Sequence, residues 1–302
     1  MKHRHLALIA VAACGLAAAQ TASAEDAKTA ADAAPAPDWT FPSSVSFVSD
    51  YIFRGQSQTW GRPAAQVSVE ADHKSGFYAG FFGSNVSDQW LPGASVETDL
   101  YAGFRGTVPS TEFGFDVGAI YYIYPGGDWK ESGFNPPNND PDGNPYAPGT
   151  TKPNKLDTAE AYASLSYKWL SVKTGVTLTD YWGWNTNNSG VGIGFAGNPK
   201  AGVTGSTSGS YFFEANATYE VMPSWTVSGQ VGRQVISNST GLDITYYKIG
   251  LTKAFDGGWS VGAFYSATNE PNAYKDFLSL RNTVSKSDIA QNKFFVNLSR
   301  AF

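Results

Sequence analysis

The last twelve residues, Gln291–Phe302, read QNKFFVNLSRAF, and they end on an aromatic side chain. Along this stretch the apolar side chains Phe294, Val296 and Leu298 alternate with polar ones such as Asn297. This period of two predicts a β-strand with one apolar and one polar face. An aromatic residue at the end of such a strand is typical of bacterial outer-membrane β-barrels, although any half-buried antiparallel sheet has the same period.

The same alternation recurs from Ser43 onward, in segments of about ten to fourteen residues. A tilted β-strand of this length crosses a bilayer. The clearest segment is Ser210–Met222, where Phe213 and Tyr219 share one face and Glu214 lies on the other. The twelve strand candidates are Ser43–Gln56, Arg62–Asp72, Gly76–Val86, Ala94–Val108, Thr111–Tyr124, Leu156–Trp169, Leu170–Trp182, Ser210–Met222, Trp225–Ile236, Leu242–Phe255, Trp259–Asn269 and Asp288–Phe302.

The connections between these segments alternate in length. The second, fourth, sixth, eighth and tenth segments are followed by tight turns, at His73–Ser75, Pro109–Ser110, Trp169–Leu170, Pro223–Ser224 and Asp256–Gly258. Longer connections follow the third, fifth, seventh and eleventh, and Pro125–Lys155 is rich in Pro, Asn and Gly. This asymmetry predicts an all-β, transmembrane up-and-down antiparallel β-barrel, with short periplasmic turns and long extracellular loops. A soluble β-sandwich is the alternative, but its strands are usually shorter.

The N-terminus predicts export. Residues 1–24 combine Lys2 and Arg4 with an apolar stretch and an Ala-x-Ala ending, which indicates a secretory signal peptide cleaved before Glu25. Alternatively, Cys14 belongs to a lipobox and is lipidated. Residues 25–42 predict a flexible periplasmic linker, and residues 43–302 the barrel.

Composition narrows the function further. Cleavage before Glu25 removes the single cysteine, which excludes disulfides and Cys-ligated metals, and removes two positive charges, which changes the formal charge from −5 to −7. An acidic chain argues against a nucleic-acid partner. After the signal peptide no apolar stretch is long enough for a helical membrane span, and the mean hydropathy of −0.26 fits strands with one polar face.

Charges on the polar parity of the strands are candidate lumen-lining groups. They are Asp50, Arg54, Glu70, Asp72, Glu97, Asp99, Arg105, Asp116, Glu160, Lys168, Lys173, Glu214, Glu220 and Lys248. Acidic residues outnumber basic ones in this set, so an open lumen is predicted to prefer cations weakly. Asp50 and Arg54 lie too far apart along one strand to pair, so each is expected to pair with a neighbouring strand. Such charges either set ion preference or brace a filled lumen.

Catalytic and metal sites are not indicated. His73 is the only histidine after the signal peptide and falls in a turn, which leaves no candidate general base of the kind that an esterase or protease needs. Asp140–Asn144 lacks the terminal glutamate of a calcium loop. We therefore expect a protein that is not an enzyme and that has no catalytic, cofactor-binding or metal-binding residues.

Tryptophans near the ends of the segments predict two interfacial girdles. Those beside short turns are Trp169, Trp225 and Trp259, and those at the other end are Trp60, Trp90, Trp182 and Trp184. A carbohydrate-binding track is the alternative for the second group. Arg233 and Arg300 fall on the apolar parity, which requires a bulge or a side chain that reaches the membrane rim.

One stretch of the first segment, Ser49–Thr59, reads SDYIFRGQSQT. Together with Ser75–Gly80, Glu97–Gly103 and Tyr121–Pro125 it resembles the TorF-type porin family, bacterial outer-membrane proteins formerly described as conserved hypotheticals. The resemblance covers most of the mature chain and implies a porin-like outer-membrane barrel. Pro125–Lys155 is longer than the family pattern, so nothing carries over to that loop.

The predicted function is an outer-membrane porin that lets small solutes or ions diffuse passively, without a cofactor. Its expected partners are outer-membrane lipid and the barrel-assembly machinery, which would recognise the strand ending in Phe302. Both mature termini are expected in the periplasm of a Gram-negative cell. The sequence does not decide whether the barrel forms a homo-oligomer. The alternative is a closed barrel that acts as an adhesin, receptor or structural protein through its extracellular loops.

Overall fold

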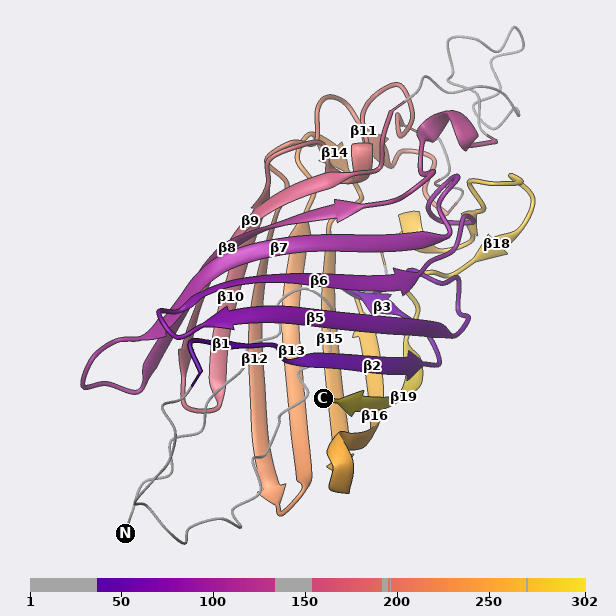
Figure 1. Ribbon diagram of the computed structural model, residues 1–302. Coiled ribbons are helices and arrows are strands. Elements are labelled where there is room, and N and C mark those ends of the chain that lie inside the picture. The colour runs from indigo at the N-terminus through magenta and orange to yellow at the C-terminus, as the bar shows by residue number, and fades with distance from the viewer. Residues whose placement is uncertain (1–36, 134–153, 192–194, 196, 270) are drawn as a thin grey trace, which may run out of the picture.

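Twelve antiparallel strands form a closed barrel in the computed structural model, which describes residues 37–133, 154–191, 195, 197–269 and 271–302. Each barrel strand pairs with the next along the chain, and the last pairs with the first (Figure 1). The predicted twelve-stranded up-and-down barrel is therefore confirmed. Its strands are β2 (Ser43–Val48), β5 (Ala64–His73), β6 (Phe77–Asn85), β7 (Val96–Thr107), β8 (Phe113–Ile123), β9 (Thr158–Tyr167), β10 (Leu170–Thr177), β12 (Tyr211–Met222), β13 (Trp225–Val235), β15 (Ile244–Ala254), β16 (Trp259–Thr268) and β19 (Lys293–Ala301).

The C-terminal strand closes the barrel, as its alternation predicts. Strand β19 pairs with β16 on one side and with β2 on the other, in a register that runs from Asn297 opposite Val48 to Ala301 opposite Ser44. A further short strand, β1 (Trp39–Thr40), pairs with the end of β5. The expected signal peptide, Cys14 and residues 25–36 of the expected linker lie outside the described residues.

Side chains alternate between the two faces of the barrel wall. Outward-facing apolar side chains are widely exposed, as with Phe294 at 72% and Phe47 at 62%, whereas Asp99 and Gln234 on the inner face are fully buried. An apolar surface that wraps the whole wall is unfavourable in water, so its physical complement is hydrocarbon. The polar parity of each strand thus becomes the interior. Among the described residues, no helix has the length and apolar composition to cross a membrane.

Short connections gather at one end of the barrel, called the turn end here. They consist of residues 74–76, 108–112, 168–169, 223–224 and 255–258. Ser110, Lys168 and Ser224 adopt positive φ in three of these turns. The exposed Trp169 and Trp259 lie at this end, where Arg300 stacks on Trp259 and Phe302.

The opposite end, called the loop end, carries the longer connections (Figure 1). Several contain short paired strands or single helical turns rather than unstructured chain. These are the hairpin of β3 (Ile52–Phe53) and β4 (Gln56–Ser57), the pair β11 (Gly202–Val203) and β14 (Ser239–Thr240), the pair β17 (Phe277–Leu278) and β18 (Lys286–Ser287), and the 3₁₀ turns η1 (Trp129–Glu131), η3 (Tyr181–Gly183) and η5 (Asn272–Tyr274). Within the expected long loop, residues 134–153, which include Asp140–Asn144, lie outside the described part of the chain.

Candidate functional site

The first loop of the barrel folds into its interior. Strand β2 ends at Val48 and not at Gln56 as the alternation predicts, because the chain turns inward at Ser49 and forms the β3–β4 hairpin. The reversal takes place at Arg54 and Gly55, whose φ angles are 44° and 81°. We call residues 49–61 the plug hairpin.

Asp50 anchors the base of the plug hairpin to the barrel wall. Its Oδ1 accepts hydrogen bonds from Ser57 Oγ at 2.5 Å and Thr59 Oγ1 at 2.9 Å, which fasten the two arms of the hairpin together. Its Oδ2 accepts from Lys293 Nζ of β19 at 3.0 Å. One carboxylate therefore holds both the shape of the hairpin and its attachment to the last strand.

Arg54 carries the tip of the plug hairpin to the far side of the barrel. Its Nη2 donates to both carboxylate oxygens of Glu160 on β9, at 2.8 and 3.0 Å, and its Nη1 donates to Gln234 Oε1 on β13 at 2.7 Å. The guanidinium also lies 3.7 Å from the ring centre of Phe212 on β12. Four barrel strands separate β2 from β9 in one direction, and three separate β2 from β13 in the other, so the hairpin spans the lumen.

The tip of the plug hairpin requires a glycine at position 55. A Cβ at this position would lie 2.7 Å from Thr268 Cγ2 and 2.8 Å from Tyr246 Cβ, in addition to the positive φ of 81°. Both contacts are on β15 and β16, which follow β19 along the wall from β2. The Arg54-Gly55 pair within the Ser49–Thr59 stretch thus supplies the charge that docks the hairpin and the only residue type that fits at its turn.

An aromatic cluster covers the plug hairpin at the loop end. Trp90, Trp129, Trp182 and Trp184 are between 2% and 7% exposed, and we call these four the tryptophan cap. Three of the indole N–H groups donate hydrogen bonds in the interior: Trp90 to Gln58 of the hairpin at 3.2 Å, Trp182 to Tyr124 Oη at 2.7 Å, and Trp129 to the Trp182 carbonyl at 2.9 Å. The prediction that Trp60, Trp90, Trp182 and Trp184 form an outer girdle is wrong for the last three, because the loops fold inward over the lumen. Trp60 is half-buried, with its ring centre 6.4 Å from that of Phe277.

Packing between the plug hairpin and the tryptophan cap is tight. The ring centre of Phe53 lies 5.6 Å from that of Trp182, and the cavity between hairpin and cap measures about 10 Å³. Such a space holds at most a single water molecule. Burial and the nearby Glu97 and Asp99 carboxyl groups raise the pKa of Tyr124 well above its usual value, so its phenol stays neutral beneath the cap. This end of the lumen is closed in the structure.

Beneath the plug hairpin, charged and phenolic groups follow the inner wall from β5 to β9. Arg105 pairs with Glu70 at 2.5 Å and also with Asp72, and its guanidinium lies over the Tyr78 ring. Tyr78 Oη in turn donates to Asp116 at 2.6 Å. This array fixes long side chains along this part of the wall.

Not all inward carboxylates have a basic partner in the part of the chain that the structure describes. Glu97 accepts a hydrogen bond from Tyr51 at 3.2 Å, whereas Glu214 accepts one from Tyr246 at 2.8 Å and also lies opposite Lys173 in the pairing of β10 with β12. Asp99 is fully buried beside Glu97. Inward carboxyl groups therefore outnumber inward basic groups in the described interior.

Toward the turn end, the inner face is polar, uncharged in large part, and half-exposed. Gln230 donates to Asn216 at 2.9 Å, and the Ser260 and Ser299 hydroxyls lie 2.7 Å apart. Similar half-exposed inner positions are Ser44, Ser46, Ser68, Ser164, Ser166, Thr218 and Ser228. These residues line a bowl that is open at the turn end and closed above by the plug hairpin, and we call it the vestibule.

Most of the predicted lumen charges lie inside the barrel. The structure places inside Asp50, Arg54, Glu70, Asp72, Glu97, Asp99, Arg105, Asp116, Glu160, Lys173, Glu214 and Lys248. Two lie elsewhere than expected. Lys168 occupies an exposed turn, where it pairs with Glu112 at 3.3 Å, and Glu220 is exposed and accepts from the Ser224 amide.

Two further inward residues were missed by sequence reasoning. Lys293 lies one position before the outward Phe294, so the alternation of the last strand places it inside. Gln234 is likewise inward because Arg233 faces outward. Both contact the plug hairpin, and no sequence pattern announces a contact with a loop that folds back into the lumen.

The described residues contain no cluster of three or more His, Cys, Asp or Glu side chains placed to hold a metal ion. His73 lies at the turn end against Trp39, with ring centres 4.7 Å apart. The prediction that His73 falls in a turn is wrong, because it is the last residue of β5 and pairs with Trp39 of β1; its Nδ1 lies 2.7 Å from Ser75 Oγ in the adjoining turn.

Comparison with known proteins gives low similarities to solved barrels. The KdgM porin in complex with disordered oligogalacturonate has 8% identity and a TM-score of 0.46, with 87% of this chain and 99% of that chain covered. The NanC porin gives the same identity, coverage and TM-score. A TodX mutant monoaromatic hydrocarbon channel has 11% identity and a TM-score of 0.39, with 88% of this chain and 90% of that chain covered. No curated protein matches.

A family model, in contrast, matches residues 32–302, which is nearly the whole chain after the expected signal peptide. The family's description states no activity, and the resemblance to TorF-type porins stays a prediction. The chain belongs to the Gcw_chp family, bacterial proteins of unknown function.

Proposed function

We propose that this protein is an outer-membrane channel of the porin class, which passes small solutes or ions and whose conduit is controlled by the plug hairpin. The observation that carries the proposal is the contrast between the two faces of one wall. The outer face is apolar on all sides, and the inner face carries a charged array above a half-exposed polar vestibule. A water-filled lumen inside a lipid-exposed wall requires this contrast.

The way the plug hairpin is attached supports a conduit that opens. Its two anchors are ion pairs, Asp50 with Lys293 and Arg54 with Glu160. These two polar contacts can be exchanged for water when the hairpin moves, and the apolar contact between Phe53 and Trp182 at the cap is the part of its attachment that water disfavours exposing. Below the hairpin the vestibule already presents hydroxyl and amide groups, such as Gln230 and Asn216, to a solute.

Orientation and export belong to the same proposal. The turn end would face the periplasm together with both mature termini, and the loop end the exterior, as in known barrels with short turns. Residues 1–24 would be removed as a signal peptide, residues 25–42 would connect to the barrel 43–302, and the strand ending in Phe302 would engage the assembly machinery. Lipid and small solutes would be the partners in the membrane.

A second function is favoured by the tryptophan cap. Four buried indoles close the loop end as a folded layer, which is what a barrel needs to present loops to an external partner. In that reading the barrel stays closed and serves as an adhesin, receptor or structural protein. Liposome swelling with sugars of graded size separates the two: entry of the smallest sugar supports the channel, and no swelling with folded protein supports the closed barrel.

The channel is expected to prefer cations, because inward carboxylates outnumber inward basic groups in the described interior. Replacing Asp116 and Glu214 with Asn and Gln removes two negative charges that have tyrosine partners. The cation-to-anion permeability ratio, measured as the reversal potential under a salt gradient, should then fall toward one. Glu112→Gln, at an exposed turn, is the matched control and should leave the ratio unchanged. Anion preference of the unmodified channel would contradict the proposal.

A further inference from the structure

Arg233 is a charged residue on the outer, apolar face of the barrel. The register across β12, β13 and β15 is continuous here, with Phe213 opposite Arg233 and Arg233 opposite Thr245, so no bulge turns the side chain inward. Its side chain is 51% exposed and lies two residues before the loop end of β13. An arginine facing lipid is destabilising near the bilayer centre and tolerated only near the rim, which places it at the level of lipid head groups.

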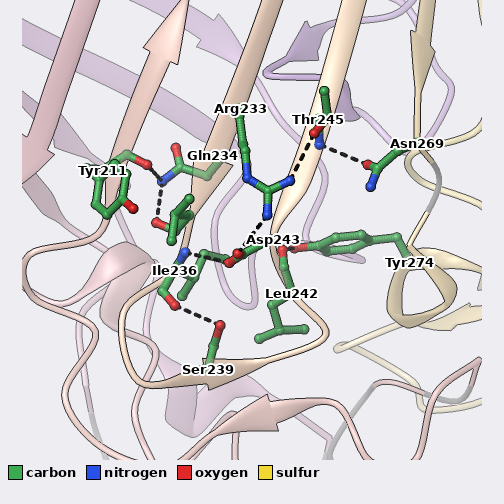
Figure 2. A network of polar contacts seen from close by, with 11 residues as sticks. Tyr211, Arg233, Gln234, Ile236, Ser239, Leu242, Asp243, Thr245, Asn269 and Tyr274 are labelled. Atoms are coloured by element: carbon green, nitrogen blue, oxygen red, sulfur yellow. Dashed lines mark hydrogen bonds and ion pairs between the residues drawn. The ribbon is translucent and has the colours of Figure 1, made fainter.

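The guanidinium of Arg233 is held but not enclosed (Figure 2). Its Nη1 donates to Thr245 Oγ1 at 3.1 Å, and its Nη2 donates to Asp243 Oδ2 at 3.1 Å. Asp243 is itself fixed, because its Oδ1 accepts from the Ile236 amide at 3.0 Å. A guanidinium has five N–H donors, so this arrangement orients the group while its remaining donors face the half-exposed outer side.

An apolar groove of about 520 Å³ lies directly beside Arg233 on the outer wall. It crosses β9, β10, β12 and β13, and its outward-facing lining comprises Ala163, Leu165, Val172, Phe213, Ala215 and Val231. The hollow arises because Ala163 and Ala215 stand between bulkier neighbours on paired strands. The groove is within the range of about 300–1,000 Å³ that small-molecule sites occupy.

We propose that this groove and Arg233 form a binding site for a phosphorylated lipid of the outer leaflet. An acyl chain would lie in the groove, and a phosphate group would bind the guanidinium. The groove runs across four strands in two adjacent rows of side chains, and Leu165 and Val172 lie in the row farther from the loop end, on the side toward which an acyl chain descends from its head group. Arginine suits phosphate because its planar fork donates two parallel hydrogen bonds to neighbouring oxygens.

Asp243 sets the strength of this site. It shares the guanidinium and partly neutralises it, so a phosphate must compete with or join the carboxylate at one cation. Two substitutions at this ion pair are therefore expected to change lipid retention in opposite directions. Arg233→Gln should weaken retention of the lipid, and Asp243→Asn should strengthen it, since the asparagine oxygen can still accept from the Ile236 amide.

The test is native mass spectrometry of the full-length mature barrel in micelles that contain lipid A or its dephosphorylated form. We expect the unmodified barrel to retain the phosphorylated lipid, and Arg233→Gln to lower that retention at least about tenfold, since the charge-assisted hydrogen bonds to the phosphate are lost. Ala215→Phe, which fills the groove, should lower it while leaving Arg233 in place. Arg300→Gln is the matched control, an arginine at the other rim that stacks on Trp259 and Phe302.

Equal retention of the two lipids, or unchanged retention by Arg233→Gln, would overturn the site. The inference rests on the proposed insertion in an outer membrane, which is measured separately as folding into liposomes. A barrel that folds into liposomes but shows no phosphate-dependent retention refutes only the lipid site. A chain that does not fold into liposomes refutes the proposed function as well.

Discussion

Arg54→Ala should release the plug hairpin and raise the channel's conductance more than any other single substitution. The side chain forms a buried ion pair with Glu160 and a hydrogen bond with Gln234, and its loss leaves the Glu160 carboxylate buried without its cation. Removing one partner of such a pair destabilises the docked arrangement by about 3–5 kcal/mol, which raises the undocked population more than about a hundredfold. Conductance of single barrels in planar bilayers measures the effect.

Two variants show whether the effect belongs to the ion pair. Arg54→Lys keeps the charge but loses the two-pronged contact, so its conductance should lie between those of the unmodified protein and Arg54→Ala. Arg62→Ala is the matched control, because Arg62 is exposed just beyond the plug hairpin. A conductance of Arg54→Ala equal to that of Arg62→Ala would show that the Arg54 contacts do not hold the hairpin.

Trp182→Ala should destabilise the loop end by about 3–5 kcal/mol, the usual effect of emptying a buried aromatic site. Trp182 is 6% exposed, its ring packs against Phe53 and Tyr122, and its indole donates to Tyr124. Urea unfolding in detergent micelles, followed by tryptophan fluorescence, measures the loss. Because the cap covers the hairpin, the same variant should also make the loop end more accessible to protease.

Trp169→Ala is the control for removing a tryptophan side chain that is not buried. Trp169 is 48% exposed at the turn end, so its removal leaves no cavity and should change the unfolding free energy by less than about 1 kcal/mol in micelles. If the two alanine variants were equally stable, the tryptophan cap would not be a packed layer.

The barrel itself could be predicted from the sequence because its physical basis is local. Alternation along a strand such as Lys293–Ala301 decides which face meets lipid, and turn residues such as Pro223 and Ser224 decide where strands end. Neighbours along the chain then pair in order, and an even number of strands lets β19 close antiparallel on β2. The number of strands and the set of inward-facing positions could both be predicted without knowing any contact between residues distant in the sequence.

The plug hairpin could not be predicted in the same way. Residues 49–56 continue the alternation of β2, and Asp50 and Arg54 fall on the inward parity whether the chain stays in the wall or turns into the lumen. What decides between the two is the set of partners on β9, β13 and β19, which lie far away in the sequence. The one local sign of a turn is Gly55, because the residues after it, Gln56–Thr59, are all polar and the apolar alternation stops there.

The girdle prediction for the buried tryptophans was wrong for a related reason. Trp90 lies on one loop and Trp182 and Trp184 on another, and each alone resembles an interfacial girdle residue. Only the folding of those loops over the lumen brings the rings together. Lys168 was misplaced by a shift of the turn, because its positive φ ends β9 before the residue that alternation assigns to the strand.

The most direct test of the account replaces residues 50–60 with a short Gly-Ser linker that joins Ser49 to Gly61. Conductance of this barrel and of the unmodified protein is measured in planar bilayers, with heat-modifiable migration on gels to show that both are folded. The account predicts a steady, larger conductance without the plug hairpin and a smaller, intermittent one with it. Folded barrels that are both silent, or that conduct equally, would contradict the claim that this hairpin controls a conduit through the membrane.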